Sequence, residues 1–337
     1  MISKNIWATF VFALLFTGAT SISYGQDYTY DDAADAFTEA NEYAEANEFD
    51  AAIEKFVEAA DIAATLGEQG EEVESRAKSQ ITRMSLQKLS MLANNREWEE
   101  AIAWVDRIEE LDAQYGDGSA FERAQGGLPQ FYLSWGNDLL QEEQNEEAVE
   151  MYEKAIELRE NYTRAHYQLG LAHRRLGDLS ASLDALDRSM ELAEEQGESD
   201  DLSRARSQAR DYLIYRGSEA TDDERFDEAE EYLTRALGYD AESARLHYRL
   251  AELYNVTERF QEGLEHAQKG LEFETGGASD MARIYFELGV AYKGLGNESD
   301  ACDAFINAAH GDYRSAAEHE LEYELDCDGW EEQVGRR

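Results

Sequence analysis

The 337-residue sequence has very little proline, little cysteine and few basic residues. Its one proline is Pro129, and a near absence of proline from long runs of periodic apolar and polar residues favours an all-helical protein. Basic residues number 30 against 74 acidic ones, which gives a formal net charge of −44. This acidity argues against nucleic acid as a partner, because phosphates need a basic surface, and against adhesion to an anionic membrane.

Lysine is especially rare, with 7 residues against 23 arginines. Repulsion between like charges destabilises a compact fold unless salt screens it, and at 1 M salt the Debye length is roughly 3 Å. An acidic, lysine-poor composition resembles that of halophilic proteins, so we expect a salt-adapted chain. The alternative is an ordinary acidic protein that acts outside the cytoplasm.

Residues 1–25 differ in composition from the rest of the chain. Lys4 precedes the apolar run IWATFVFALLFT (6–17), and Ser23 and Gly25 occupy the −3 and −1 positions of a cleavage site. The run is shorter than the roughly 20 apolar residues that a membrane span needs. We therefore predict a secretory signal peptide over 1–25 and an exported protein, periplasmic or extracellular, with no membrane insertion after cleavage. An uncleaved anchor is the alternative.

A pattern of two adjacent helices recurs along the chain. The stretches HYQLGLAHRRLGDLSASLDAL (166–186) and YFELGVAYKGLGNESDACDAF (285–305) share two Leu-Gly pairs and an acidic, small-residue helix start. A search with this pattern aligns seven small residues: Ala52, Ala101, Ala148, Ser182, Ala229, Gly263 and Ala301. From Ala148 to Gly263 the successive spacings are 34, 47 and 34 residues. The pattern resembles the tetratricopeptide repeat (TPR) family, whose unit is 34 residues of paired antiparallel helices.

The resemblance implies an all-α fold, a right-handed α-solenoid of antiparallel helix pairs with a C-terminal capping helix. It predicts a repeat array over 26–310 and a capping helix and tail over 311–337. The predicted units are 33–62, 82–112, 129–160, 163–194, 210–241, 244–275 and 282–310. Because the proline that usually ends the family's unit is absent, polar turns must end these helices. The stretch GDGSAFERAQGGLPQ (116–130) is the loosest predicted linker.

Position 8 of the unit is glycine in four places: Gly136, Gly170, Gly217 and Gly289. Glycine inside a helix costs about 1 kcal/mol relative to alanine. We expect glycine here because position 8 faces the small residue at position 20 of the partner helix, so that the two backbones can approach closely. These glycines therefore predict a packing contact rather than a phosphate-binding loop.

The two cysteines flank the predicted cap. Cys302 lies early in the second helix of the last unit, and Cys327 directly follows the predicted amphipathic helix over 312–325. In an oxidising compartment we expect them to form a disulfide that pins the cap to that unit, whereas in the cytosol they would be buried free thiols.

The sequence contains none of the common catalytic or cofactor motifs: no GxSxG, P-loop, HExxH or CxxC. The six histidines are scattered, and most fall where the family places packing residues. We therefore expect a protein that is not an enzyme and has neither a cofactor nor a metal site.

In the TPR family, partner peptides commonly lie in the concave groove against unit positions 2, 5, 9, 12 and 13 of the first helices. In this chain those positions hold seven basic and four acidic residues, and Arg83 is the one base outside the last four units. The resemblance therefore implies a groove for an acidic or carboxylate-bearing segment of a partner protein, since arginine pairs with carboxylates bidentately. The predicted groove residues are Arg164, Tyr167, Arg174, Arg175, Arg245, Tyr248, Arg249, Arg283, Phe286 and Lys293.

Two classes of function remain open at this point. One is a scaffold or adaptor of the cell envelope that holds a protein or peptide partner, and the other is a structural or self-assembling envelope component. The groove arginines have an alternative role as well, in ion pairs with glutamates of neighbouring units. Arg245 and Arg249 resemble part of the carboxylate clamp of chaperone-binding members, but Tyr167, Leu171 and Ser218 replace its other residues. A chaperone adaptor is therefore not implied, and the oligomeric state stays open.

Overall fold

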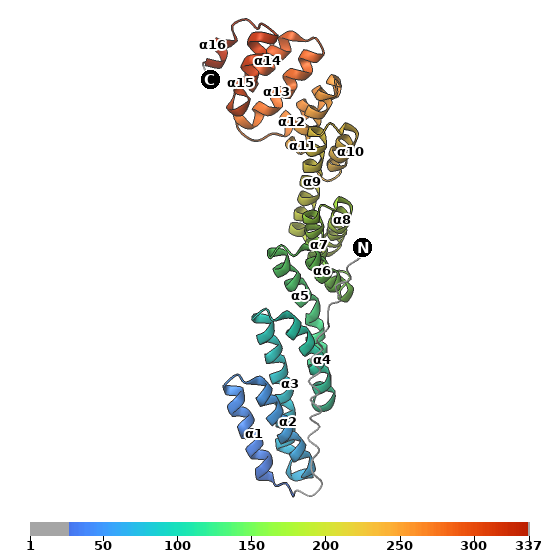
Figure 1. Ribbon diagram of the computed structural model, residues 1–337, viewed down its shortest axis with the longest axis vertical. Coiled ribbons are helices and arrows are strands. Elements are labelled where there is room, and N and C mark those ends of the chain that lie inside the picture. The colour runs from blue at the N-terminus through green and yellow to red at the C-terminus, as the bar shows by residue number, and fades with distance from the viewer. Residues whose placement is uncertain (1–26, 336–337) are drawn as a thin grey trace, which may run out of the picture. The chain divides into compact units, whose positions relative to one another are not determined.

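The computed structural model describes residues 27–335, so the predicted signal peptide lies outside the described range. Within that range the regular secondary structure is helical throughout (Figure 1). The chain divides into two compact units between Gly127 and Leu128. In each unit, consecutive helices joined by short turns pack against one another, which confirms the predicted all-α fold of antiparallel helix pairs.

The described part of the N-terminal unit, residues 27–127, contains four α-helices and the beginning of a fifth. These are α1 (Tyr30–Glu45), α2 (Phe49–Thr65), α3 (Glu71–Asn94), α4 (Trp98–Tyr115) and α5 (Ser119–Gln141), the last of which continues into the second unit. Its core is formed by fully buried side chains such as Phe56, Ile81 and Met84. Helix α3 is 24 residues long. It begins well before the predicted unit 82–112, shortly after the turn at Gly67.

The C-terminal unit contains the rest of α5 and the remaining helix pairs. Its helices are α6 (Asn145–Leu158), α7 (Thr163–Leu176), α8 (Leu179–Gln196), α9 (Ser199–Asp222), α10 (Phe226–Leu237), α11 (Ala244–Val256), α12 (Phe260–Phe273), α13 (Ala278–Gly294) and α14 (Glu298–Ala308). Each pair buries a stripe of leucine and alanine against its neighbours, and Leu183, Leu186, Leu213 and Leu233 are fully buried in the largest cluster.

The turn inside each helix pair has the same backbone conformation. One residue of every such turn has a positive φ, between 59° and 79°: Asn47, Arg96, Glu143, Gly177, Glu224, Glu258 and Gly296. This left-handed conformation normally favours glycine, yet five of the seven residues carry a side chain. The turn is therefore set by the packing of the two helices that it joins.

The structure corrects the predicted linker over 116–130. Only the short turn from Gly116 to Gly118 is irregular, and residues 119–130 belong to α5, with Pro129 inside the helix. The linker prediction was wrong because Ala120 and Ala124 recur at helical spacing and are buried. The division between the two compact units does fall within this stretch.

The C-terminal cap is less regular than the predicted single helix over 312–325. It consists of a 3-10 turn (Gly311–Tyr313), α15 (Arg314–His319), a π turn (Glu320–Glu324) and the separate helix α16 (Trp330–Gly335), which the sequence did not indicate. Leu321 and Val334 are buried against the last helix pair. The sulfur atoms of Cys302 and Cys327 lie at disulfide distance, and their Cα atoms are 6.0 Å apart.

Across residues 27–335, no helix has both the length and the apolar character that a bilayer span requires.

Candidate functional site

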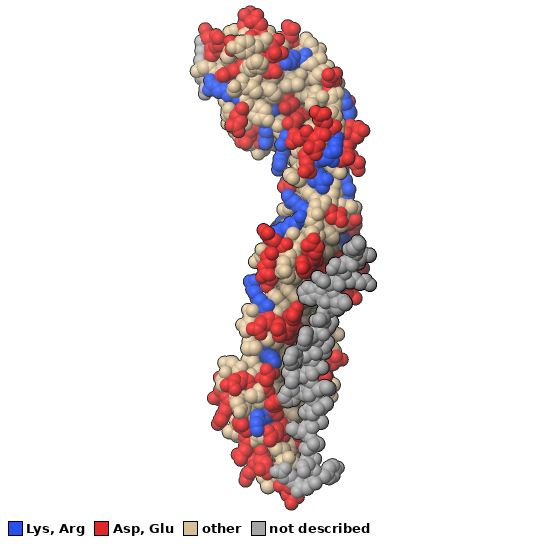
Figure 2. Space-filling model, in the orientation of Figure 1, with Lys and Arg blue, Asp and Glu red and all other residues tan. Residues whose placement is uncertain are grey.

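The predicted groove residues lie on the first helices of three pairs in the C-terminal unit. Arg164, Tyr167, Arg174 and Arg175 are on α7, Arg245, Tyr248 and Arg249 are on α11, and Arg283, Phe286 and Lys293 are on α13. Figure 2 shows Lys and Arg side chains gathered around α9 and α11, among many Asp and Glu side chains. The sequence-based alignment therefore places these residues on the intended helices, but their contacts differ from one helix to the next.

Three of the predicted groove bases already have carboxylate partners. Arg249 Nη1 lies 2.7 Å from Glu252 Oε2, and Arg283 Nη2 lies 2.9 Å from Glu274 Oε2. Lys293 Nζ is 2.5 Å from a carboxylate oxygen of the cap residue Glu320. For these three residues, the structure supports the alternative role in internal ion pairs.

Two predicted groove aromatics are covered by the cap. The hydroxyl of Tyr248 is 2.8 Å from the hydroxyl of Tyr313, and the ring of Phe286 lies 5.5 Å from the ring of Tyr313 and 5.4 Å from that of Phe305. Burial, with a smaller effect from the Tyr313 hydrogen bond, raises the pKa of Tyr248 far above its usual range. Together with the Lys293–Glu320 pair, these contacts mean that the cap occupies the α13 end of the predicted groove.

The remaining four arginines have no carboxylate partner among the described residues. Arg164 and Arg245 are exposed. Arg174 Nη1 donates to Gln208 Oε1 at 2.7 Å, and its guanidinium carbon lies 5.4 Å from the centre of the Tyr212 ring. Arg175 donates to the carbonyl oxygen of Leu140. We call Arg164, Arg174, Arg175 and Arg245 the open arginines, and they define the candidate site of this unit.

The remaining aromatic residue of the predicted set, Tyr167, is half-buried. It packs against the largest core cluster, beside α9. Burial raises the pKa of its hydroxyl, so the residue stays neutral at physiological pH. Tyr167 therefore acts as a packing residue at the edge of this cluster, and it supplies no charge.

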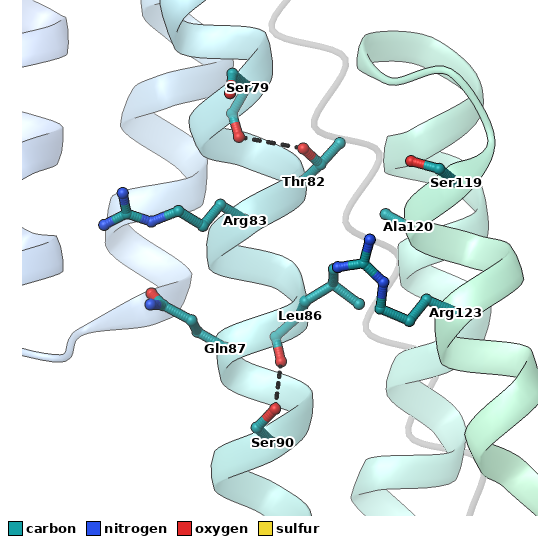
Figure 3. Close-up of a pocket in the computed structure, with 9 residues that line it drawn as sticks. All are labelled: Ser79, Thr82, Arg83, Leu86, Gln87, Ser90, Ser119, Ala120 and Arg123. Carbon is teal, nitrogen blue, oxygen red and sulfur yellow. Dashed lines mark hydrogen bonds between the residues drawn. The ribbon is translucent and has the colours of Figure 1, made fainter.

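Arg83, the predicted groove base of the N-terminal unit, has an arginine neighbour that sequence reasoning missed. Arg83 on α3 and Arg123 on α5 line the same cavity, which has a volume of about 420 Å³ (Figure 3). Arg123 was overlooked because the sequence assigned its segment to a linker. Once α5 is known to begin at Ser119, Arg123 falls on the first helix of a pair.

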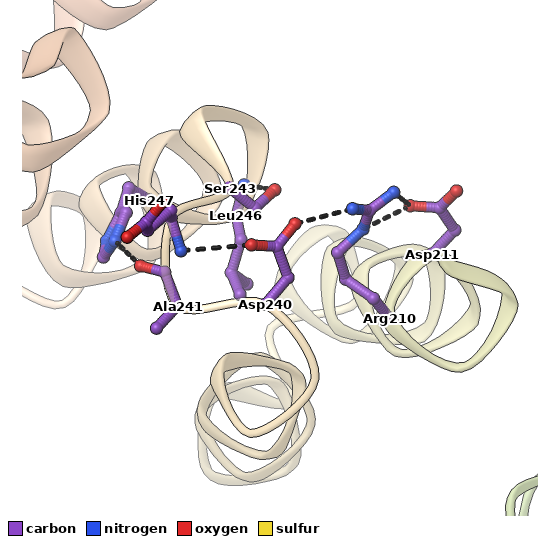
Figure 4. Close-up of polar contacts among 8 residues, drawn as sticks. Arg210, Asp211, Asp240, Ala241, Ser243, Leu246 and His247 are labelled. Atoms are coloured by element: carbon purple, nitrogen blue, oxygen red, sulfur yellow. Dashed lines mark hydrogen bonds and ion pairs between the residues drawn. The ribbon is translucent and has the colours of Figure 1, made fainter. Parts of the chain in front are cut away.

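A polar network fixes the start of α11, and Arg210 on α9 is its main member (Figure 4). Its Nη1 donates to Asp240 Oδ2 at 2.6 Å and its Nη2 lies 2.9 Å from Asp211 Oδ1. Asp240 Oδ1 accepts the backbone N–H of Glu242, and the Ser243 hydroxyl accepts the N–H of Leu246 as the helix cap. The predicted use of polar turns in place of proline is therefore seen directly before α11.

Two histidines form a pair behind this network, with His247 buried and His266 half-buried. His247 Nε2 donates to the carbonyl of Ala241 at 2.9 Å, and His247 Nδ1 is 2.9 Å from His266 Nδ1. His247 Nδ1 therefore accepts a hydrogen bond from the Nδ1–H of His266, which requires the His247 ring to be neutral. Burial lowers the pKa of His247 and lowers that of His266 to about 4, with a smaller contribution from His247. Among the described residues, no group of three or more His, Cys, Asp or Glu is placed to hold a metal ion.

Glu287 on α13 is a buried carboxyl that sequence reasoning also missed. Its Oε2 accepts from Asn255 Nδ2 at 2.9 Å, and only 8% of the residue is exposed. Burial raises its pKa to about 7, although the Asn255 hydrogen bond acts in the opposite direction. The residue links α11 to α13 inside the core, so we assign it a structural role.

The comparisons with known proteins identify the type of helical repeat that these helix pairs form. The family described as TPR repeat matches residues 136–177, and the family described as tetratricopeptide repeat matches residues 163–196 and 220–285. The chain therefore contains tetratricopeptide repeats, which generally serve as non-enzymatic scaffolds for protein or peptide partners.

Several solved structures are similar to parts of the chain. MamA from Desulfovibrio magneticus RS-1 is 18% identical, over 61% of this chain and 99% of its own, with a TM-score of 0.37. YrrB, described as a TPR protein with an unusual peptide-binding site, is 19% identical over 57% of this chain and 91% of its own, with a TM-score of 0.36. A thermophilic TPR protein of Thermus thermophilus is 18% identical over 58% of this chain and 99% of its own, with a TM-score of 0.28. No curated protein matches the sequence.

Proposed function

We propose that this protein is a non-enzymatic scaffold or adaptor of the cell envelope, exported to the periplasm or the extracellular space. It holds an acidic or carboxylate-bearing segment of a partner protein in the groove lined by α7, α9 and α11. The TPR matches in this unit support a protein or peptide partner. The open arginines support the acidic character of that partner.

The observation that carries the proposal is that the open arginines have no carboxylate partner among residues 27–335. The chain has 74 acidic residues, and the other three groove bases are all neutralised by nearby carboxylates. An unneutralised guanidinium on an acidic protein retains its capacity for charge-assisted, bidentate hydrogen bonds. Arg174 is also supported by the Tyr212 ring and the Gln208 side chain, so part of its conformational entropy is already lost before a ligand binds.

An affinity capture from the native envelope fraction at high salt tests this proposal. The first bait is the chain from residue 26 onward, and the second carries Arg164→Glu and Arg245→Glu. Both positions are exposed, so the substitutions change the charge of the groove without removing a packing contact. A matched control with Lys154→Glu and Lys269→Glu changes the net charge equally at exposed positions on second helices.

We expect the native bait and the control to capture the same partner, and the groove variant to lose it. Recovery of that partner by all three baits would overturn the role of the open arginines. Recovery of only further copies of this chain would instead favour the alternative, a self-assembling envelope component.

A further inference from the structure

The segment that follows the last helix pair makes contacts that a cover for the apolar core does not need. Residues 311–324, which we call the strap, comprise the 3-10 turn, α15 and the π turn, and they pack against α13 and α14 (Figure 1). The strap contains five acidic residues against one arginine, Arg314. It therefore has the chemical character of the ligand that we propose for the groove.

One side of the strap is apolar and packs on α14. Ala317 and Leu321 are fully buried there, in the cluster that also contains Phe305. These contacts cover the apolar end of the repeat array, which is the ordinary role of a capping segment. They do not account for the polar side of the strap.

The polar side of the strap neutralises a base that the family alignment assigns to the groove. Lys293 Nζ lies 2.5 Å from Glu320 Oε2 and 3.8 Å from Glu324 Oε2. Only 17% of the Glu320 side chain is exposed, so this ion pair is partly shielded from solvent. Two carboxylates of one acidic segment thus pair with one groove base, as the carboxylates of a bound ligand would.

Tyr313 gives the strap an aromatic contact with the same surface. Its hydroxyl is 2.8 Å from the hydroxyl of Tyr248 on α11, and its ring lies 5.5 Å from the ring of Phe286 on α13. Both contacted residues occupy predicted groove positions. The strap therefore bridges α11 and α13 and occupies this end of the groove as an internal ligand.

The strap is attached to the repeat array at both of its ends. It follows α14, which ends at Ala308, and beyond it Cys327 lies at disulfide distance from Cys302 on α14. Its helix α15 has six residues, and a helix this short is not stable without tertiary contacts. The position of the strap therefore depends on its contacts with the array and on the crosslink, which raises its local concentration at the groove.

We propose that the strap is an autoinhibitory segment, which closes the α11–α13 end of the groove and is held closed by the Cys302–Cys327 crosslink. A dithiol opens the crosslink by thiol–disulfide exchange: both cysteines become thiols and the dithiol becomes a disulfide, so that two electrons are transferred. The strap is then free to leave Tyr248 and Lys293, which become available to an external acidic segment. The inhibitory role rests on the proposed function, whereas the closure does not.

Closure is tested without any partner. The chain from residue 26 onward is compared in its crosslinked form, after reduction with dithiothreitol, and as the Cys302→Ser/Cys327→Ser variant. Hydrogen exchange followed by mass spectrometry reports the opening of the strap and of α14 separately. Acylation of Lys293, relative to the exposed Lys269, reports access to the groove.

A second pair of variants tests the polar side of the strap in the background that lacks both cysteines. Glu320→Gln removes a carboxylate that pairs with Lys293 across the groove. Glu318→Gln is the matched control, because it changes the charge equally and its carboxylate pairs with Arg314 within the strap.

Without the crosslink, we expect exchange across 311–324 and the Lys293 acylation ratio to rise by about fivefold or more, while α14 stays protected. Glu320→Gln should raise the exchange further, and Glu318→Gln should not. Unchanged exchange of the strap, equal exposure of α14, or equal effects of the two glutamate variants would each overturn the proposal. The segment would then be an integral part of the core.

A peptide with the sequence of residues 311–324, end-capped and carrying a photo-crosslinker, tests the inhibitory role. We expect it to label α13 in the variant with Glu320→Gln and no cysteines, but not in the crosslinked chain, where the internal strap occupies the surface. A peptide with glutamine at positions 320 and 324 is the control and should label α13 much less. Equal labelling of α13 in both proteins, or none in either, would show that the strap is not an internal ligand. Labelling of α7 reports the open arginines, so a failure of the proposed function is seen separately.

Discussion

At the scale of single residues, position 8 requires glycine mainly because the large side chain at position 24 of the partner helix leaves no room for a Cβ. A Cβ added to Gly170 would lie 2.7 Å from Cγ of Leu186, and one added to Gly289 would lie 2.7 Å from the ring of Phe305. The small residue at position 20, on which the sequence-based explanation relied, contributes its backbone, since the carbonyl of Ser182 would be 3.1 Å from the new Cβ of Gly170. That explanation was therefore incomplete.

We predict that Gly170→Ala destabilises the protein by about 1 to 3 kcal/mol, because the strain of overpacking exceeds the gain in helix propensity. Gly126→Ala is the matched control: it lies inside α5, and a Cβ there would meet no atom of the described residues within 4 Å. The control should stabilise the protein by up to about 1 kcal/mol. Urea unfolding at constant salt gives both values, and a stabilising Gly170→Ala would contradict the packing argument.

The His247–His266 pair makes stability depend on pH. The pKa of a histidine is about 6.5 in an unfolded chain, whereas the fold lowers that of His266 to about 4. Unfolding therefore takes up a proton between these pH values, and the pair's contribution is complete above pH 6.5 and falls as the pH decreases towards 4. We expect the stability difference between the native chain and His266→Gln to shrink by about 1 to 2 kcal/mol from pH 7 to pH 5.

Urea unfolding at several pH values measures this difference. The comparison with the variant is needed because Glu287, whose raised pKa of about 7 gives the opposite pH dependence, titrates in the same range. Parallel pH curves for the two proteins would show that the pair does not control this dependence.

At the scale of elements, the cap contributes more than a polar cover for the last helix pair. Its residues Tyr313 and Glu320 contact Tyr248, Phe286 and Lys293, all of which the family alignment assigns to the groove. The segment also buries Leu321 and Val334 against α14. The cap therefore completes the apolar core, and it covers the α13 end of the predicted groove.

We predict that the Cys302→Ser/Cys327→Ser variant is less stable than the oxidised protein by about 3 kcal/mol, since the crosslink restricts the unfolded chain across 25 residues. Urea unfolding of the two proteins measures the effect. Thiol labelling of the native, exported protein provides the independent check. Labelling of both cysteines without a reductant would show that the crosslink is not formed in the cell.

At the scale of the whole molecule, charge is the dominant property. The excess of 44 acidic over basic residues cannot be neutralised internally, and many of the ion pairs join residues only three or four positions apart on one helix. Such exposed pairs contribute little stability, so most of the repulsion remains for the solvent to screen.

We predict that the melting temperature rises by several degrees between 0.1 M and 2 M NaCl, because screening removes repulsion from the folded state. A neutral osmolyte at the same osmolality serves as the control and should have a smaller effect. A melting temperature that does not change with salt would contradict the proposal of a salt-adapted protein.

The sequence by itself determined the helix pairs, because a period of 3.6 residues and recurring small residues at fixed spacing are local properties of the chain. It also placed Cys302 and Cys327 in segments that the fold brings together. The turn residues with positive φ escaped detection, since Arg96, Glu143 and Glu258 do not have the composition that usually signals this conformation.

Only the tertiary structure decided which basic residues are available to a ligand. Lys293 is paired with a residue 27 positions away, and Arg175 bonds a carbonyl 35 positions away, whereas Arg83 and Arg123 come from separate helices to one cavity. The family alignment assigned Arg83, Arg175 and Lys293 to groove positions alike. It assigned no position to Arg123. The distinction depends on which groups of other helices lie within a few ångströms, and this is fixed by the packing of helices rather than by the pattern within any one of them.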